Sequence, residues 1–288
     1  MKKTFLAVAL LLTMSLGACA IEPGSTKKEK VYEVDENFKI DPGTLSVTAL
    51  KTSAEDAFIL ETENHTFVMD TGMNRKGKKL VEILKEHGVE KVDAIIISHY
   101  DKDHVGGADR VIDNFDVGTV YTTYRSKNSE EMAEYYAALK RKNLAETVVT
   151  EETTFEADGV TFTIYPPKSK SYVEDISNNS SLAMRVVNGN KSMLFTGDAL
   201  DERIAELVNT PGLESNILKV PHHGREKADF ETFVNYINPE YAVITSSKSE
   251  PAAPQVVEAL ENKGVKIYYT RDDKIIFTIT SDNIEVSR

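Results

Sequence analysis

Short apolar segments separated by turn residues run from Leu45 to the C-terminus, and their spacing predicts alternating strands and helices. Segments rich in β-branched and aromatic residues predict strands at 45–50, 57–62, 66–72, 93–98, 159–167, 181–198 and 216–224. Helices are predicted at 76–88, 130–144 and 254–264. A closing β-hairpin is predicted at 266–280.

The predicted elements fall into two halves, and each half begins with a run of strands. This order predicts an α+β fold, an αββα sandwich in which two mixed sheets pack face to face with helices outside. A chain of 288 residues is long enough for one large domain of this kind, which we place at residues 44–288.

The N-terminal segment has a different character. Residues 1–18 carry a basic start, an apolar run and small residues, which is typical of a secretory signal peptide. The sequence LGAC ends at Cys19, the only cysteine of the chain, and resembles the lipobox of bacterial lipoproteins. We therefore predict a lipid anchor at Cys19 on the extracytoplasmic face of the cell membrane, followed by a polar tether at 19–43. A soluble secreted protein cleaved nearby is the alternative.

The charge balance restricts how a polyanion can bind. The net charge is −12, from 34 basic and 46 acidic residues. A field of this sign repels nucleic acid at long range, so a polyanionic substrate needs a local basic patch or a metal ion.

The sequence SHYDKDHVGG at 98–107 follows directly on an apolar strand. It carries His99, Asp101 and Asp103 at alternate positions, and His104 comes next. Alternate residues of an extended segment point to the same side, so the first three can converge. Side chains of these types in this number predict ligands for divalent cations.

Two further strand ends carry polar residues. LFTGD ends at Asp198, and LKVPHHG carries His222 and His223. Taken singly, each has an ordinary structural interpretation, because an aspartate after glycine commonly caps a turn and paired histidines are commonly surface or core residues. Taken together, the three strand ends predict one metal site at a common rim of the sandwich.

These motifs, with VMDTG at 68–72 and NNSSLAMR at 178–185, resemble the metallo-β-lactamase fold superfamily. The resemblance is to the branch similar to the C-terminal domain of the DNA-uptake protein ComEC. The common motif of the superfamily is H-x-H-x-D-H, and this chain has Asp101 at the place of the second histidine. The resemblance covers residues 45–279.

The resemblance implies two divalent metal ions, zinc or manganese, and it implies which residues bind each ion. The implied ligands are His99 and Asp101 for metal one, Asp103, His104 and His222 for metal two, and Asp198 as the bridge between them. Asp70 is expected to accept a hydrogen bond from a ligand histidine. Asn178 and Ser181 stand where many relatives have a third histidine, and are expected to contact metal or substrate.

The implied chemistry is hydrolysis by a hydroxide that bridges the two cations, with Asp103 orienting it. His223 either protonates the leaving group or has a structural role. Arg225 and Lys227 stand where relatives have small hydroxyl residues, so we expect them to bind substrate. Relatives also carry a GHP segment before the last large helix, and no histidine is present at the corresponding place here.

Three functions are compatible with the sequence. The favoured one is a membrane-anchored phosphodiesterase or nuclease, with a phosphodiester substrate, possibly DNA, and no obligate protein partner. The second is a hydrolase of lactones, thioesters or β-lactams. The third is a metal-bound binding protein without catalysis, as the missing GHP histidine suggests.

Overall fold

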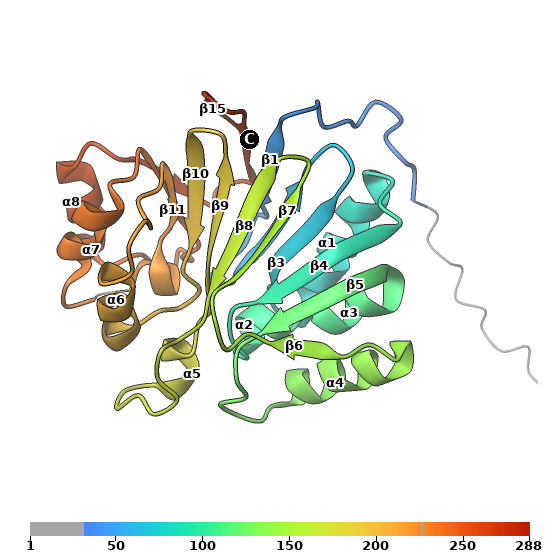
Figure 1. The fold of residues 1–288 in the computed structure, drawn as a ribbon, viewed down its shortest axis with the longest axis horizontal. Coiled ribbons are helices and arrows are strands. Elements are labelled where there is room, and N and C mark those ends of the chain that lie inside the picture. The colour runs from blue at the N-terminus through green and yellow to red at the C-terminus, as the bar shows by residue number, and fades with distance from the viewer. Residues whose placement is uncertain (1–31, 226) are drawn as a thin grey trace, which may run out of the picture. The chain divides into compact units, whose positions relative to one another are not determined.

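The computed structural model describes residues 32–225 and 227–288 (Figure 1). Its first sheet has eight strands. These strands are β1 (Leu45–Ala49), β2 (Ala57–Glu61), β3 (Thr66–Thr71), β4 (Lys91–Ile97), β5 (Asp116–Thr122), β6 (Glu146–Val148), β14 (Ile275–Ile279) and β15 (Ile284–Ser287). Their order across the sheet is β15-β14-β1-β2-β3-β4-β5-β6. The pairs from β3 to β6 are parallel and the others antiparallel, so the sheet is mixed.

The second sheet has seven strands from the C-terminal half of the chain. They are β7 (Thr153–Ala157), β8 (Val160–Tyr165), β9 (Ala183–Asn188), β10 (Lys191–Phe195), β11 (Ile217–Lys219), β12 (Tyr241–Ile244) and β13 (Lys266–Tyr269). Their order is β13-β12-β11-β10-β9-β8-β7, with parallel pairs from β10 to β13 and antiparallel pairs elsewhere.

Helices cover the outer face of each sheet (Figure 1). On the first sheet lie α1 (Asn74–Glu86), α3 (Ala108–Asn114) and α4 (Glu130–Lys142), and on the second α6 (Asp201–Val208), α7 (Phe230–Ile237) and α8 (Pro254–Asn262). Three short helices connect strands, namely α2 (Lys102–Val105), α5 (Ile176–Asn179) and the 3-10 helix η1 (Pro221–Gly224). Within the described residues, every helix is too short or too polar to span a bilayer.

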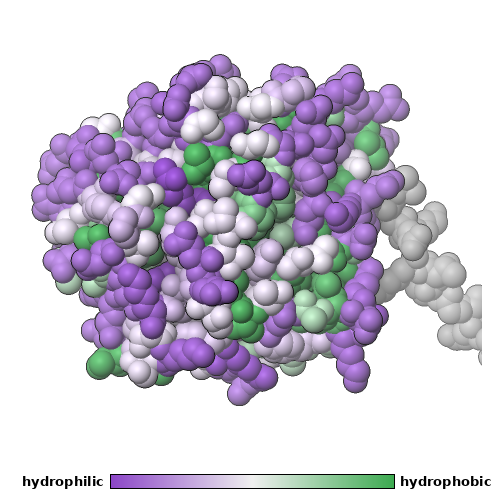
Figure 2. All heavy atoms as spheres, viewed as in Figure 1, coloured by the Kyte–Doolittle hydropathy of each residue, from purple (hydrophilic) through white to green (hydrophobic). Residues whose placement is uncertain are grey.

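The core is divided into layers by the alternation of side chains along the strands. In β4, Ala94 and Ile96 pack between the two sheets, while Ile95 and Ile97 pack beneath the helices. A third apolar cluster fills the space between the second sheet and its helices. These layers confirm the predicted αββα sandwich. Polar side chains cover most of the face shown in Figure 2, with apolar ones in small separate patches.

Two sequence predictions need correction or refinement. The predicted hairpin at 266–280 does not form, because β13 joins the second sheet and β14 pairs with β1 in the first. Within the predicted tether, residues 32–43 contact the domain: the Asp35 amide donates to the Glu86 carbonyl at 2.7 Å, and the ring of Phe38 stacks on His87. The predicted signal peptide and Cys19 lie outside the described residues.

Candidate metal centre

Three strand ends bring the polar motifs to one place. β4 ends at Ile97 and leads through His99 into α2, β10 ends shortly before Asp198, and β11 leads into η1 with His222 and His223. Because β4 lies in one sheet and β10 and β11 in the other, both halves of the sandwich contribute side chains. A rigid pair of sheets therefore positions the connecting segments.

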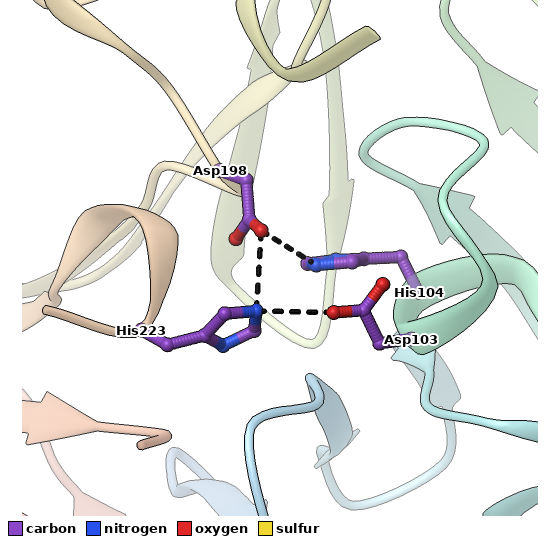
Figure 3. A group of neighbouring side chains, drawn as sticks. All are labelled: Asp103, His104, Asp198 and His223. Atoms are coloured by element: carbon purple, nitrogen blue, oxygen red, sulfur yellow. Dashed lines mark ion pairs between the residues drawn. The ribbon is translucent and has the colours of Figure 1, made fainter. Parts of the chain in front are cut away.

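Asp103, His104, Asp198 and His223, here called the central group, have ligand atoms that all lie within 4.8 Å of one another (Figure 3). Nε2 of His223 lies 3.1 Å from Oδ2 of Asp198 and 3.3 Å from Oδ2 of Asp103. Nε2 of His104 lies 3.3 Å from the same Asp198 oxygen. The Asp198 carboxylate is thus shared by the two imidazoles.

The central group fits a divalent cation. Nε2 of His104 and Nε2 of His223 are both buried and have no hydrogen-bond partner among the described residues. Two imidazole nitrogens and two carboxylates that face one another form a donor set suited to zinc and, because half of the donors are oxygens, also to manganese. A cation in their midst would satisfy both orphaned nitrogens.

In His104 and His223, the other ring nitrogen, Nδ1, contacts a buried polar side chain. Nδ1 of His104 lies 2.9 Å from Oδ2 of Asp70, which also accepts from the Ser98 hydroxyl at 2.7 Å. Nδ1 of His223 lies 2.9 Å from the Thr245 hydroxyl. An Nδ1–H that donates to Asp70 leaves Nε2 of His104 as the lone-pair nitrogen, which is the tautomer a metal ligand needs.

The charges of the central group balance internally. Burial raises the pKa of Asp198, but His223 and His104 hold it well below its ordinary value. Burial lowers the pKa of His223, but Asp198 and Asp103 raise it to about 10. The pKa of His104 is likewise raised well above its ordinary value by Asp198, against the effect of burial. In the metal-free protein the two imidazoles therefore carry positive charge, and each would lose its Nε2 proton when a cation binds.

Asp56 and Lys219 form a buried ion pair next to the central group, and neither was predicted from the sequence. Nζ of Lys219 also donates to the Gly197 carbonyl at 2.8 Å and lies 3.5 Å from Oδ1 of Asp198. Oδ1 of Asp56 lies 3.5 Å from Nδ1 of His223. A lysine within an otherwise apolar strand was the one available signal, because such a residue is rarely buried without a paired charge.

The residues predicted for metal one lie beside the central group but are engaged differently. Nε2 of His99 is buried without a hydrogen-bond partner among the described residues, and lies 3.7 Å from Oδ1 of Asp101. That oxygen accepts a hydrogen bond from Nζ of Lys127 at 2.6 Å and another from the Ser177 hydroxyl. Contrary to the prediction from the sequence, the segment from His99 to Asp103 is not extended throughout, because α2 begins at Lys102 and turns Asp103 toward His223.

Asn178 and Ser181, the two residues of the NNSSL segment that were predicted to contact metal or substrate, have separate contacts. The Ser181 hydroxyl accepts from the Asp198 amide at 3.0 Å and lies 3.4 Å from Nδ1 of His99. The Asn178 side chain instead donates to Asp175 at 3.1 Å. Ser181 therefore supports a residue of each half of the site, while Asn178 is engaged within its own helix and cap.

His222, which was predicted to bind metal two, lies outside the central group. His223, which was predicted to protonate the leaving group or to have a structural role, lies in the central group in its place. Both histidines have left-handed backbone, with φ of 48° and 56°, and Gly224 follows with φ of 81°. A side chain on Gly224 would clash with Ala252, whose Cβ lies 2.8 Å from the ideal Cβ position. This tight turn swings His223 inward and leaves His222 at the edge, which strand alternation does not predict.

The residues predicted to bind substrate lie around His222. Nδ1 of His222 is 3.1 Å from Nζ of Lys227, and its Nε2 is 3.5 Å from Nη1 of Arg225. Burial and the nearby Lys227 lower the pKa of His222 to about 3, although Asp198 opposes this. Arg225 is half exposed and pairs with Glu250 at 2.6 Å. The neighbouring cations make His222 a poor place for a further metal ion.

Residues 51–246 match the Metallo-beta-lactamase superfamily, and the chain belongs to this superfamily. It is similar to Competence protein ComA of Neisseria gonorrhoeae, at 28% identity over 219 residues, and to ComE operon protein 3 of Bacillus subtilis, at 24% over 197 residues. These matches confirm the resemblance to ComEC-type competence proteins. They cover 74% and 67% of this chain but 29% and 25% of the relatives, so the chain spans less than a third of their length.

Solved structures support the same fold at low sequence identity. The metallo-beta-lactamase fold protein YhfI from Bacillus subtilis superposes with a TM-score of 0.56 at 12% identity, covering 85% of this chain and 100% of that one. CmlA, a diiron beta-hydroxylase from Streptomyces venezuelae, superposes with a TM-score of 0.53 at 12% identity, covering 83% and 55%. Because a hydroxylase shares the fold, these similarities establish architecture and leave the reaction to be argued from the site.

Proposed function

We propose that this protein is a metal-dependent phosphodiesterase whose cation is held by Asp103, His104, Asp198 and His223. The observation that carries the proposal is the pair of buried Nε2 atoms that converge on the shared Asp198 carboxylate. A divalent cation bound there would supply a water nucleophile near neutral pH and neutralise charge that develops on the substrate. The fold alone does not fix the reaction, so the substrate class needs its own support.

Within the central group, Asp103 is the residue that reaches solvent. Its side chain is about a fifth exposed (22%), whereas His104, Asp198 and His223 are almost fully buried. Substrate therefore approaches from the Asp103 side. Burial raises the pKa of Asp103, but the His223 imidazole 3.3 Å away lowers the value to about 2, so this carboxylate is ionised at neutral pH and can accept a proton from the attacking water.

Two features support a phosphodiester over an uncharged ester. The chain is similar to Competence protein ComA, and its motifs resemble the branch of the DNA-uptake protein ComEC, which favours a nucleic-acid-related substrate. Three cationic side chains, from Lys127, Arg225 and Lys227, lie next to the predicted ligand residues in an otherwise acidic chain. Guanidinium and ammonium groups bind phosphate oxygens through charge-assisted hydrogen bonds, which an uncharged ester would not use.

A panel of substrates tests this proposal. The full chain, supplied with Mn²⁺ or Zn²⁺, is assayed with bis(p-nitrophenyl) phosphate, a short oligonucleotide, p-nitrophenyl acetate, a lactone and a β-lactam. We expect cation-dependent cleavage of the two phosphodiesters and little of the others. Preferential cleavage of the carboxylic substrates would support the alternative hydrolase, and binding of Mn²⁺ or Zn²⁺ with no turnover of any substrate would support a binding protein.

We also propose that Cys19 carries a lipid that holds the protein on the extracytoplasmic face of the cell membrane, as the LGAC sequence indicates. Cys19→Ser should move the protein from the membrane fraction to unprocessed or released forms. Processing and fractionation identical to those of the wild type would contradict the anchor.

A further inference from the structure

The two halves of the predicted two-cation site differ in the donors they offer. The central group has four side chains whose ligand atoms lie within 4.8 Å of one another. The other half has His99 and Asp101, 3.7 Å apart. Asn178, which was expected to assist there, bonds to Asp175 instead. Catalytic zinc sites commonly have three protein ligands, and besides the Asp198 carboxylate, which the central group already shares, only two donors are left for a second tightly bound cation.

In the half that contains His99, Lys127 already forms an ion pair with the Asp101 carboxylate. Nζ of Lys127 lies 2.6 Å from Oδ1 of Asp101, which is the oxygen nearest to His99, and the Ser177 hydroxyl donates to the same atom. Lys127 comes from the segment between β5 and α4, in the other half of the chain from Ser177. The side chains of Asp101 and Lys127 are 25% and 35% exposed, so the pair is partly shielded from solvent.

We propose that this protein binds one divalent cation tightly, in the central group, and that the ammonium of Lys127 takes the place of the second. A cation coordinated by Oδ1 of Asp101 would lie close to the ammonium that bonds the same oxygen, and like charges at this separation repel strongly in a partly buried site. An ammonium has three donors, so Lys127 can hold Asp101 and still donate to a phosphate oxygen of the substrate.

This inference rests on the proposed function only in requiring that the central group bind a divalent cation, and it is independent of the substrate. It also gives Lys127 a role that motif spacing does not indicate, because the residue lies outside every motif of the superfamily resemblance. The ammonium of Lys127 would supply, at the Asp101 carboxylate, the positive charge that a second metal ion would otherwise supply.

Cation stoichiometry tests the inference without an activity assay. The full chain is freed of metal with chelator, titrated with Mn²⁺ by calorimetry, and examined by electron paramagnetic resonance for coupling between neighbouring Mn²⁺ ions. The wild type should take up one tight equivalent with an uncoupled signal. Lys127→Ala should bind a second Mn²⁺ with an affinity about tenfold or more higher than that of the wild type. Its resonance signal should show coupling between the two ions.

Two variants serve as controls. Lys127→Arg keeps the positive charge and should remain at one tight equivalent. Lys140→Ala removes an exposed lysine of α4 with the same change in net charge, and should also behave as the wild type. A second equivalent in Lys127→Ala alone would therefore assign the effect to the ammonium at Asp101.

Two outcomes would overturn the inference. One is two tight, coupled Mn²⁺ ions in the wild type, and the other is a single equivalent in a folded Lys127→Ala. Both leave the proposed phosphodiesterase intact, since the central group would still hold a cation. Failure of the wild type to bind any divalent cation would instead contradict the proposed function and this inference together.

Discussion

Asp70 fixes the ring of His104 by accepting a hydrogen bond from Nδ1 at 2.9 Å. Asp70 itself has left-handed backbone, with φ of 53°, at the end of β3. The Ser98 amide donates to its other oxygen at 2.7 Å, so the carboxylate is held from both sides. The strained backbone and the two contacts together direct Nε2 of His104 toward Asp198.

Asp70→Asn should weaken binding of the cation by about 10- to 100-fold, because an amide oxygen is a poorer acceptor for the imidazole and removes a charge. Competition with a fluorescent chelator measures the affinity. Asp93→Asn is a matched control, since Asp93 also lies in the first sheet and pairs with Lys91 at 2.6 Å, away from the central group. Equal affinities in the two variants would remove Asp70 from the site.

The metal-free protein should lose stability as the pH rises above neutrality. The pKa of His223 is about 10 in the folded protein, while an unfolded histidine has a pKa of about 6.5. The raised value means that the protonated ring favours folding fully below about pH 6.5, and that this contribution is lost as the pH rises toward about 10. His104 is shifted in the same direction.

Thermal unfolding of chelated and cation-loaded protein between pH 7 and 9 measures this effect. The difference in Tm between the two forms should widen with pH, because the loaded imidazoles have already lost their protons. His223→Gln should flatten the decline in the chelated protein. A chelated wild type that is equally stable at pH 7 and pH 9 would contradict the assigned protonation.

Lys219→Met should destabilise the metal-free protein by about 3–5 kcal/mol, since it leaves Asp56 buried without its paired charge. Urea unfolding measures the loss. Lys79→Met is the control, because Lys79 is half exposed, lies 3.7 Å from Glu82, and should contribute below about 0.5 kcal/mol. A loss no larger than that of the control would mean that the Lys219–Asp56 pair does not support the centre.

Arg225→Ala should raise KM for a phosphodiester by about tenfold or more, as expected for a charge-assisted contact worth about 1.5–3 kcal/mol. KM for an uncharged ester should change little. The half-exposed guanidinium is 2.6 Å from Glu250 and must leave this partner to hold a phosphate. Arg141→Ala, which removes an arginine paired with Asp113 on the outer helices, should leave both constants unchanged. Equal losses on both substrates would exclude Arg225 from phosphate binding.

The layers of the fold were predictable because each strand and helix has its own repeat of apolar residues. In β4, the unbroken apolar run 94–97 puts apolar side chains on both faces of the strand, as a strand between two apolar layers requires. The pairing of strands is not local information. Residues 266–280 have the pattern of a hairpin, yet β13 and β14 lie in different sheets, because each adds to an edge or partner formed by distant residues.

The site was predictable to the level of its motifs and not of its individual contacts. Asp103, His104 and Asp198 meet as expected from strand ends that share a rim. The inward position of His223 accompanies a left-handed turn, in which the ring contacts Thr245 and Gly224 lies close to Ala252. Those contacts come from chain segments remote from the HHG sequence, so its residue types alone do not indicate which histidine faces the cation.

The most direct test of the account is the recovery of phosphodiester cleavage when Mn²⁺ or Zn²⁺ is returned to chelated protein, compared between the wild type and Asp198→Asn. Asp198 is the carboxylate that both imidazoles of the central group share, at 3.1 and 3.3 Å. We predict that cleavage of bis(p-nitrophenyl) phosphate is lost on chelation, returns with the cation in the wild type, and does not return in Asp198→Asn. Cleavage that survives chelation, or that recovers equally in the variant, would contradict the assignment of catalysis to a cation in this group.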